Sequence, residues 1–308
     1  MPARHRLLHL PLLLIGLTMM LPLTFMFATA LAEPGQAGRA AGSLLDFIVP
    51  RAWHWENFAE VSRVIPFGRY YLNSLVVAVL VTVGQVFTSA CAAYAFARLE
   101  WRGRDVVFTA YLATMMVPAA VTMIPNFVLM KFLPELAAAV LPWIDWQAQR
   151  VLGTTFADPS AGRLIGIDSY FALIVPMMFS AYGTFLLRQF FLSIPREIDE
   201  AAEIDGASHW MVFSRMILPL ALPGLATLIV FTFLGVWGSF LWPLIVTNQS
   251  DLATLPIGLI AFQNQGMYGT EWHLMMAASL MILLPVIGLF LLGQRFFVSG
   301  LTVGAVKG

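Results

Sequence analysis

Apolar residues gather into six long runs, and every Asp, Glu, Lys and Arg of the chain lies outside them. The runs cover residues 7–32, 74–97, 106–130, 169–187, 220–246 and 273–292. A bilayer core requires about 20 apolar residues of helix. Backbone groups in lipid have no water to bond, so the runs must be helices. The pattern predicts an all-α, polytopic membrane protein with six transmembrane helices in a single transmembrane domain over 1–308.

The first run has a second interpretation. Arg4 and Arg6 precede it, and the sequence at residues 30–32, Ala-Leu-Ala, resembles a signal-peptidase site. The apolar part of a signal peptide covers about 7–15 residues, however, and the run 7–32 is longer. The length favours a retained first span, with a cleaved signal as the alternative.

The composition agrees with a membrane protein and excludes several functions. The chain is 59% hydrophobic and 11% charged, with a mean hydropathy of +0.81, whereas soluble domains carry about 25% charged residues. Its formal net charge is zero, which gives no indication of a nucleic-acid partner. Neither Lys131 nor Lys307 follows a glycine, so the chain has no Walker A phosphate loop and is not itself an ABC ATPase. The five histidines and Cys91 lack metal-ligand spacing, so we expect neither a metal site nor catalytic residues.

The positions of the positive charges predict the orientation. The loop between the second and third runs holds three arginines within seven residues: Arg98, Arg102 and Arg104. The loop 248–272 holds no Lys or Arg. Because short cytoplasmic loops carry an excess of Lys and Arg, we expect both termini on the cytoplasmic side. The long segments 33–72 and 131–168 would then lie outside.

A polar segment, residues 193–219, separates the fourth and fifth runs. Pro195 is tolerated in a first helical turn, and three acidic residues follow it where the helix dipole favours negative charge: Glu197, Asp199 and Glu200. Gly206 suits a left-handed helix end, and Ser208 suits the N-cap of a second helix. The sequence predicts a helix over 195–205, a turn, a second helix to Met216, and a break at Pro219.

This segment resembles the EAA loop of the ABC importer permeases. Glu200, Ala201, Ala202, Gly206, Leu218 and Pro219 fall on that pattern, and Met216 stands where the family usually has Ile. We call residues 193–219 the EAA segment. The resemblance implies a type I importer permease that docks on an ATPase through seven residues: Glu200, Ala201, Ala202, Asp205, Gly206, Leu218 and Pro219.

The resemblance to carbohydrate-type permeases extends over most of 71–308. It is carried by residues 71–75, 92–98, 115–125 and 294–308, and the tail is similar to that of the smaller maltose-importer membrane subunit. It implies a permease of a prokaryotic cytoplasmic membrane that imports a sugar or related polyhydroxyl solute. The expected partners are a second permease subunit, two ATPase subunits and an extracytoplasmic solute-binding protein. ATP and Mg²⁺ would be bound by the ATPases, with no cofactor on this chain, and the tail 300–308 would be a second contact with them.

The fifth run departs from the family at two positions, where the family usually has an amide and an acidic residue. This chain has Trp237-Gly238-Ser239-Phe240. Trp237, Ser239 and Phe240 are therefore candidates for the solute path. Alternatively, Gly235 and Ser239 form a small-residue face for helix packing.

A second departure is the outer segment 134–166, which is longer than in the family. Its Trp143 and Trp146 suit the membrane interface, where Trp is enriched. Contact with the second permease or with the binding protein is the alternative.

Two other functions are alternatives to the permease. A membrane enzyme acting on lipid-linked substrates would need converging acids, bases or metal ligands, which the sequence does not offer. An ion-coupled carrier normally keeps ionisable residues at membrane depth, and the six runs lack Asp, Glu, Lys and Arg. Copurification with a nucleotide-binding subunit would separate the permease from both.

Overall fold

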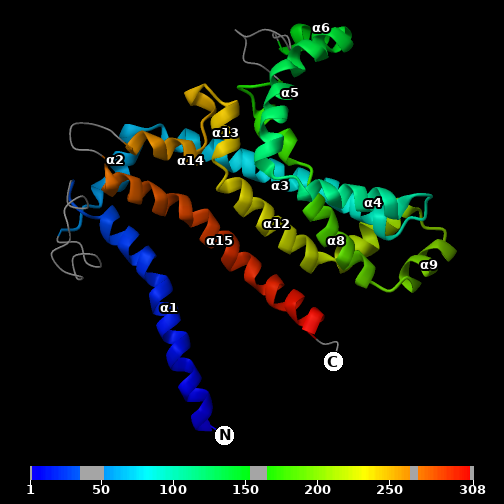
Figure 1. The fold of residues 1–308 in the computed structure, drawn as a ribbon, viewed down its shortest axis with the longest axis horizontal. Helices are drawn as coiled ribbons and strands as arrows, with labels where there is room; N and C mark the ends of the chain where they lie inside the picture. The colour runs from blue at the N-terminus through cyan, green and yellow to red at the C-terminus, as the bar shows by residue number, and fades with distance from the viewer. Residues whose placement is uncertain (1, 35–51, 153–164, 264–269, 306–308) are drawn as a thin grey trace. The chain divides into compact units, whose positions relative to one another are not determined.

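A computed structural model of the chain describes residues 2–34, 52–152, 165–263 and 270–305 (Figure 1). The described residues form helices, turns and loops but no strand, which confirms the predicted all-α class. They divide into two compact units, residues 1–71 with 255–287 and residues 72–254 with 288–308. The prediction of a single permease domain over 1–308 stays a prediction.

The first unit contains the amino-terminal helix and the start of the carboxy-terminal one. Its helices are α1 (Pro2–Ala30), α2 (Glu56–Val64), α14 (Leu255–Gly258) and the first part of α15 (Trp272–Ala305). The buried Asn57 amide donates to the carbonyls of Ala30 at 2.9 Å and Ala32 at 3.0 Å. It therefore satisfies acceptors that the end of α1 leaves without helical partners. Most apolar side chains along α1 are exposed, as expected for a helix that meets lipid or another subunit.

Four helices are long and apolar enough to cross a membrane: Pro11–Ala30, Phe67–Ala97, Ala119–Val140 and Trp272–Gln294. Two bent pairs also qualify, Tyr170–Ser193 with a bend of 42° and His209–Trp237 with a bend of 78°. The described residues thus supply four spans, or up to six if each bent pair counts as one. A polytopic helical membrane protein is confirmed, and the differences from the predicted runs lie at the breaks.

The third predicted run, 106–130, is not one helix. It contains α4 (Arg104–Ala113), a 3₁₀ turn (Thr114–Met116) and the start of α5 (Ala119–Val140). Val117 is extended, with φ −81° and ψ 118°, because Pro118 disfavours the helical conformation of the residue before it. The long helix therefore begins at Ala119 and continues past Met130.

The fourth and fifth runs are also broken. The fourth contains α7 (Tyr170–Ile174), a 3₁₀ turn at Pro176, and α8 (Ala181–Ser193), which Ser180 caps by accepting from the Gly183 N–H at 3.0 Å. In the fifth, α12 (Leu222–Trp237) ends at Gly238 and is followed by the separate α13 (Leu241–Val246).

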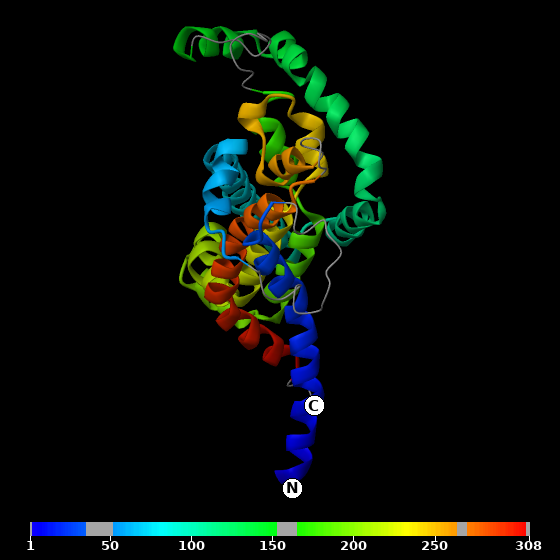
Figure 2. The same cartoon turned by 90° about the vertical axis from the view of Figure 1, so that its left-hand side faces the viewer.

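Helix α3 (Phe67–Ala97) supplies a face of small residues to the core of the second unit. Ala90, Ala93 and Ala97 are buried against α8, α12 and the EAA segment. A Cβ on Gly183 of α8 would lie 2.6 Å from the Ser89 hydroxyl oxygen, so these helices approach closely. Helix α5 lies at the periphery of this unit and is mostly exposed (Figure 2).

Candidate functional site

The EAA segment begins with α9 (Glu197–Ile204), two residues later than predicted. Gly206 follows with φ +78°, as the sequence predicts. The Gly206 N–H donates to the Glu203 carbonyl at 3.0 Å, and the Ala207 N–H donates to the Ala202 carbonyl at 2.9 Å. This pair of bonds is the Schellman motif, which closes a helix with a left-handed residue. A Cβ at Gly206 would meet nothing within 4 Å, so the backbone conformation alone accounts for the glycine.

The second helix of the segment, α10 (His209–Val212), starts at the predicted N-cap. The Ser208 hydroxyl accepts from the Met211 N–H at 3.4 Å. A serine at the N-cap stabilises the helix by about 1 kcal/mol relative to an alanine at the same position. The two short helices and their turn therefore follow from local sequence.

The end of the segment differs from the prediction. The helix continues from α10 through a π-helix (Phe213–Ile217) into α11 (Leu218–Leu220), which contains Pro219. Proline cannot donate and crowds the carbonyl four residues earlier, and a wider π turn directly before it gives that carbonyl room. The break comes at Ala221, so Pro219 lies inside the helix rather than between the EAA segment and α12.

The predicted docking residues face two ways. Ala202 is buried in the core of the second unit, so its side chain does not face outward. Leu218 is half-buried beside the same core. The exposed docking residues are Glu200, Ala201, Asp205, Gly206 and Pro219.

Two large apolar side chains lie on the outer side of the same segment. Ile204 is 87% exposed and Trp210 is 62% exposed. An exposed apolar patch that is rimmed by polar residues marks an interaction site. The EAA segment therefore presents a mixed acidic and apolar surface.

A buried arginine lies beneath this surface. The Arg98 guanidinium forms an ion pair with the Asp199 carboxylate at 2.8 Å, with the two side chains 4% and 18% exposed. It also donates to the carbonyls of Phe191 at 2.5 Å and Ile194 at 2.8 Å. Burial raises the pKa of the Asp199 carboxyl, and the nearby Arg98 charge lowers it only in part. The sequence places Arg98 among the charges that set orientation and offers no signal that pairs it with Asp199.

Other charged pairs near the segment are exposed. Arg196 contacts Glu100 at 3.2 Å, and His209 lies 3.8 Å from Glu203. Exposed pairs of this kind contribute about 0–1 kcal/mol. These pairs add charge to the surface, but they are too weak to hold the EAA segment in place.

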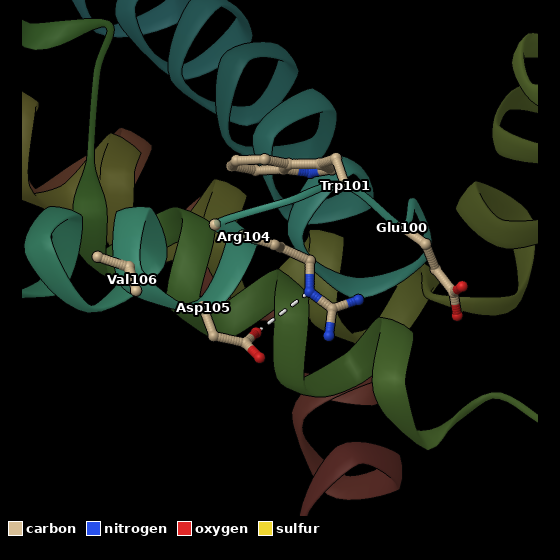
Figure 3. A pocket seen from close by; sticks show the side chains of 6 residues that line it. Glu100, Trp101, Arg104, Asp105 and Val106 are labelled. Carbon is tan, nitrogen blue, oxygen red and sulfur yellow. Dashed lines mark hydrogen bonds and ion pairs between the residues drawn. The ribbon is translucent and has the colours of Figure 1, made fainter.

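A surface cavity of about 400 Å³ lies beside the loop that joins α3 to α4. Figure 3 shows the Arg104 guanidinium directed at the Asp105 carboxylate, with Glu100 on the other side of the cavity. Arg104 bonds Asp105 at 3.1 Å and the Leu99 carbonyl at 3.3 Å. These charges hold the loop rather than converge on a ligand position.

The candidate path residues do not lie together on one open face. Trp237 is 3% exposed and stacks on Phe233, with the ring centroids 5.5 Å apart. Ser239 is half-buried, and Phe240 is exposed at the start of α13. A Cβ on Gly238 would meet only a carbonyl of its own helix, at 3.5 Å, and one on Gly235 would meet nothing within 4 Å. Packing of these glycines is therefore not seen among the described residues, and both interpretations of the fifth run stay predictions.

The apolar runs lack charged residues, but the structure contains neutral polar contacts within them. The Gln85 amide donates to the Thr232 hydroxyl at 2.9 Å. The Thr88 hydroxyl donates to the Met178 carbonyl at 2.6 Å, where the fourth run is broken. Such bonds join membrane helices.

Metal binding and the tail add little to the site. Among the described residues, no group of three His, Cys, Asp or Glu side chains could hold a metal ion. Helix α15 runs to Ala305, and residues 306–308 of the predicted tail contact lie outside the described residues.

Comparison with known proteins identifies the family. The family model described as "Binding-protein-dependent transport system inner membrane component" matches residues 84–302, which include the EAA segment and the fifth run. The chain belongs to this family. It is thus a multi-pass inner-membrane component of a transport system that works with a binding protein, and not an enzyme. The resemblance seen in the EAA segment is confirmed.

Individual relatives match most of the chain. The sn-glycerol-3-phosphate transport system permease protein UgpE of Pectobacterium atrosepticum is 33% identical over 95% of this chain and 94% of its own. The arabinooligosaccharides transport system permease protein AraQ of Bacillus subtilis is 34% identical over 78% of this chain and 74% of its own.

A solved structure shows the same fold. A chain of a bacterial ABC transporter that imports the acidic polysaccharide alginate matches 95% of this chain and 96% of its own, with a TM-score of 0.74 and 21% identity. A second alginate transporter structure, in complex with an alginate pentasaccharide-bound periplasmic protein, gives a TM-score of 0.58 and 15% identity. These likenesses confirm the type I importer permease fold.

Proposed function

We propose that this chain forms one half of the solute path in an ATP-driven importer of a sugar or related polyhydroxyl solute. A second permease subunit forms the other half. Two ATPase subunits bind ATP and Mg²⁺, and an extracytoplasmic binding protein delivers the solute. The chain itself binds no cofactor in this scheme.

The observation that carries the proposal is the EAA segment. Its outer surface combines the carboxylates of Glu200 and Asp205 with the exposed side chains of Ile204 and Trp210. Its inner side is fixed to the core through Ala202. A surface that is apolar, charged and rigidly supported suits docking into a groove of an ATPase. Because the surface is already ordered, little conformational entropy is lost on binding.

The solute class rests on the relatives. Their names give glycerol-3-phosphate and arabinooligosaccharides as solutes, and the structural neighbours import alginate. All three are polyhydroxyl compounds, although two of them are charged. Along the fifth run we place Ser239 and Phe240 before Trp237 as solute contacts, because Phe233 covers the Trp237 ring.

The orientation is part of the proposal. The EAA segment must lie on the cytoplasmic side to reach an ATPase, which agrees with Arg4, Arg6 and the arginines after α3. Both termini then lie in the cytoplasm. The loop 248–272 lies outside, where a binding protein would approach.

The test measures two things: assembly of the chain with its partner subunits, and stimulation of ATP hydrolysis by the binding protein and solute. The tagged chain should copurify with a second permease and a nucleotide-binding subunit from its native membrane. In nanodiscs, ATP hydrolysis by this complex should rise when the binding protein is added with a polyhydroxyl solute, tested over a panel of neutral sugars, acidic oligosaccharides and polyol phosphates. Stimulation by amino acids or peptides but by no member of the panel would refute the solute class. Failure to copurify with any ATPase would refute the coupling.

A further inference from the structure

Arg98 connects three separate parts of the second unit. It lies just past the end of α3, and its own N–H donates to the Tyr94 carbonyl at 2.9 Å. Its guanidinium reaches two carbonyls at the end of α8, those of Phe191 and Ile194, and the Asp199 carboxylate in the first turn of α9. One side chain thus fixes the end of one helix to the end of a second and the start of a third.

The two carbonyl contacts have a clear physical basis. The last carbonyls of a helix have no partner within it, and a cation is favoured at that end by the helix dipole. Arg98 meets both requirements for α8, where the Phe191 carbonyl also accepts from the Ile194 N–H at 3.2 Å. The planar guanidinium presents its donors in a fixed fork, so the direction of the third contact, to Asp199, is set by the first two.

The pair is poorly suited to a purely stabilising role. Both side chains are largely withdrawn from water, and in the described part of the chain the Arg98 Nε and the Asp199 Oδ1 have no hydrogen-bond partner. Taking two charges out of water costs as much as their attraction returns in many buried pairs, and apolar residues of similar volume are often as stable. What the charges add is a unique geometry.

We propose that Arg98 is a positioning residue that locks the EAA helix α9 to α3 and to the end of α8. When an ATPase displaces α9, the lock makes α3 and α8 move with it. This inference rests on the proposed docking of the EAA segment. Coupling of this kind needs packed elements that move as rigid bodies.

The decisive measurement is transport per ATP. In proteoliposomes containing the whole complex, Arg98→Met should lower solute uptake per ATP hydrolysed by about tenfold, within the range typical of coupling between sites. Glu100→Gln is the matched control, because it breaks the exposed pair with Arg196 that joins the same two regions. We expect the control to keep the wild-type ratio. A wild-type ratio for Arg98→Met would overturn the proposal.

A second variant separates positioning from stability. Arg98→Met combined with Asp199→Leu removes both charges and keeps an apolar volume in the gap. If the pair only stabilised the fold, this double variant would regain assembly and uptake together. We expect it to regain assembly and thermal stability while uptake per ATP stays low, and full recovery of uptake would refute the lock.

Asp199→Asn completes the test. It keeps the shape of Asp199, removes its charge and leaves Arg98 bonded to α8, so it gives an answer even where the Arg98 variants fail to assemble. We expect lower uptake per ATP, and an unchanged ratio would count against the lock. The proposed function is tested separately, since a wild-type complex without ATPase subunits would refute the docking itself.

Discussion

Near each of its two ends, α3 is anchored by a buried polar side chain, but the chemistry differs. At one end, the Asn73 amide donates to the carbonyls of Asp251 at 2.8 Å and Ala253 at 2.9 Å, and accepts from the Tyr170 hydroxyl at 2.6 Å. At the other, Arg98 pairs with Asp199. Arg98 lies 25 positions after Asn73, which corresponds to about 38 Å of helix, and α9 and α13 lie well apart in Figure 1.

The difference separates a fixed anchor from a coupling contact. A neutral amide whose donors and acceptor are all bonded costs little to bury, and the neighbouring loop is also held by Asp168, which accepts from the Asn248 and Gln249 N–H groups. A buried ion pair is costly and fails when one charge is lost. We therefore expect the Asn73 end to govern stability and the Arg98 end to govern coupling.

The largest expected effect concerns the sides of the membrane on which the two ends lie. We expect opposite labelling of two single cysteines in a background with Cys91 replaced by Ser. One replaces Ser250, beside the Asn73 contacts, and the other replaces Arg102, near Arg98 in the sequence. A membrane-impermeant maleimide added outside should label the first and spare the second until the cells are opened. The opposite pattern would invert the orientation and with it the assignment of the EAA segment.

Breaking the EAA turn should abolish uptake while the Asn73 end stays intact. Gly206→Val places a β-branched residue at φ +78°, at a cost of about 1–2 kcal/mol. We expect loss of ATPase binding in pull-down at normal membrane abundance. Gly206→Asn is the control, since Asn tolerates this conformation. Normal uptake by the valine variant would contradict the docking.

The Asn73 end should respond in the opposite way to the Arg98 end. Asn73→Leu removes the partner described above from the Asp251 and Ala253 carbonyls and from the Tyr170 hydroxyl. Of these three residues Ala253 is buried, and a buried group that loses its partner costs about 1–3 kcal/mol. We expect a lower unfolding temperature for the purified complex, with uptake per ATP unchanged in the complexes that survive. A fall in that ratio without loss of stability would erase the contrast between the two ends.

The smallest effect is a pH dependence of stability. Burial raises the pKa of Asp199 above its ordinary value, so the folded chain retains a proton that the unfolded chain releases. This contribution is present below the ordinary carboxyl pKa, about 3.9, and is lost as pH rises through the raised folded pKa. Groups near Asp199 are Arg98, Arg196, Glu203 and Tyr94.

The check is a comparison of melting curves for the wild type and Asp199→Asn between pH 4 and pH 7. As pH falls through this window, the wild type should gain stability relative to the variant, which cannot take up the proton. A difference that stays constant with pH would show that Asp199 titrates at its ordinary pKa.

The sequence predicts the features that depend on neighbouring residues. Gly206 and Ser208 are correctly assigned because a left-handed helix end and an N-cap are determined within a few positions. The all-α class follows from apolar runs that no soluble fold could bury. In contrast, the break at Val117 is signalled by Pro118 but hidden within an unbroken apolar run.

Features that depend on tertiary structure are not predicted. Ala201 and Ala202 are identical in sequence terms, yet one is exposed and the other is buried in the core. Arg98 and Asp199 meet only because α3 and α9 are brought together by the fold. The burial of Trp237, which is 3% exposed, likewise depends on how α12 packs.

The π-helix at 213–217 makes the number of residues in the EAA segment as important as their identity. A π turn contains one residue more than an α turn would need, and each residue of a helix turns the chain by about 100°. Deleting one residue there should leave a regular helix, yet rotate the docking surface by about that angle relative to α12. An importer with such a deletion would keep its membrane fold and its charges while presenting the wrong face to the ATPase.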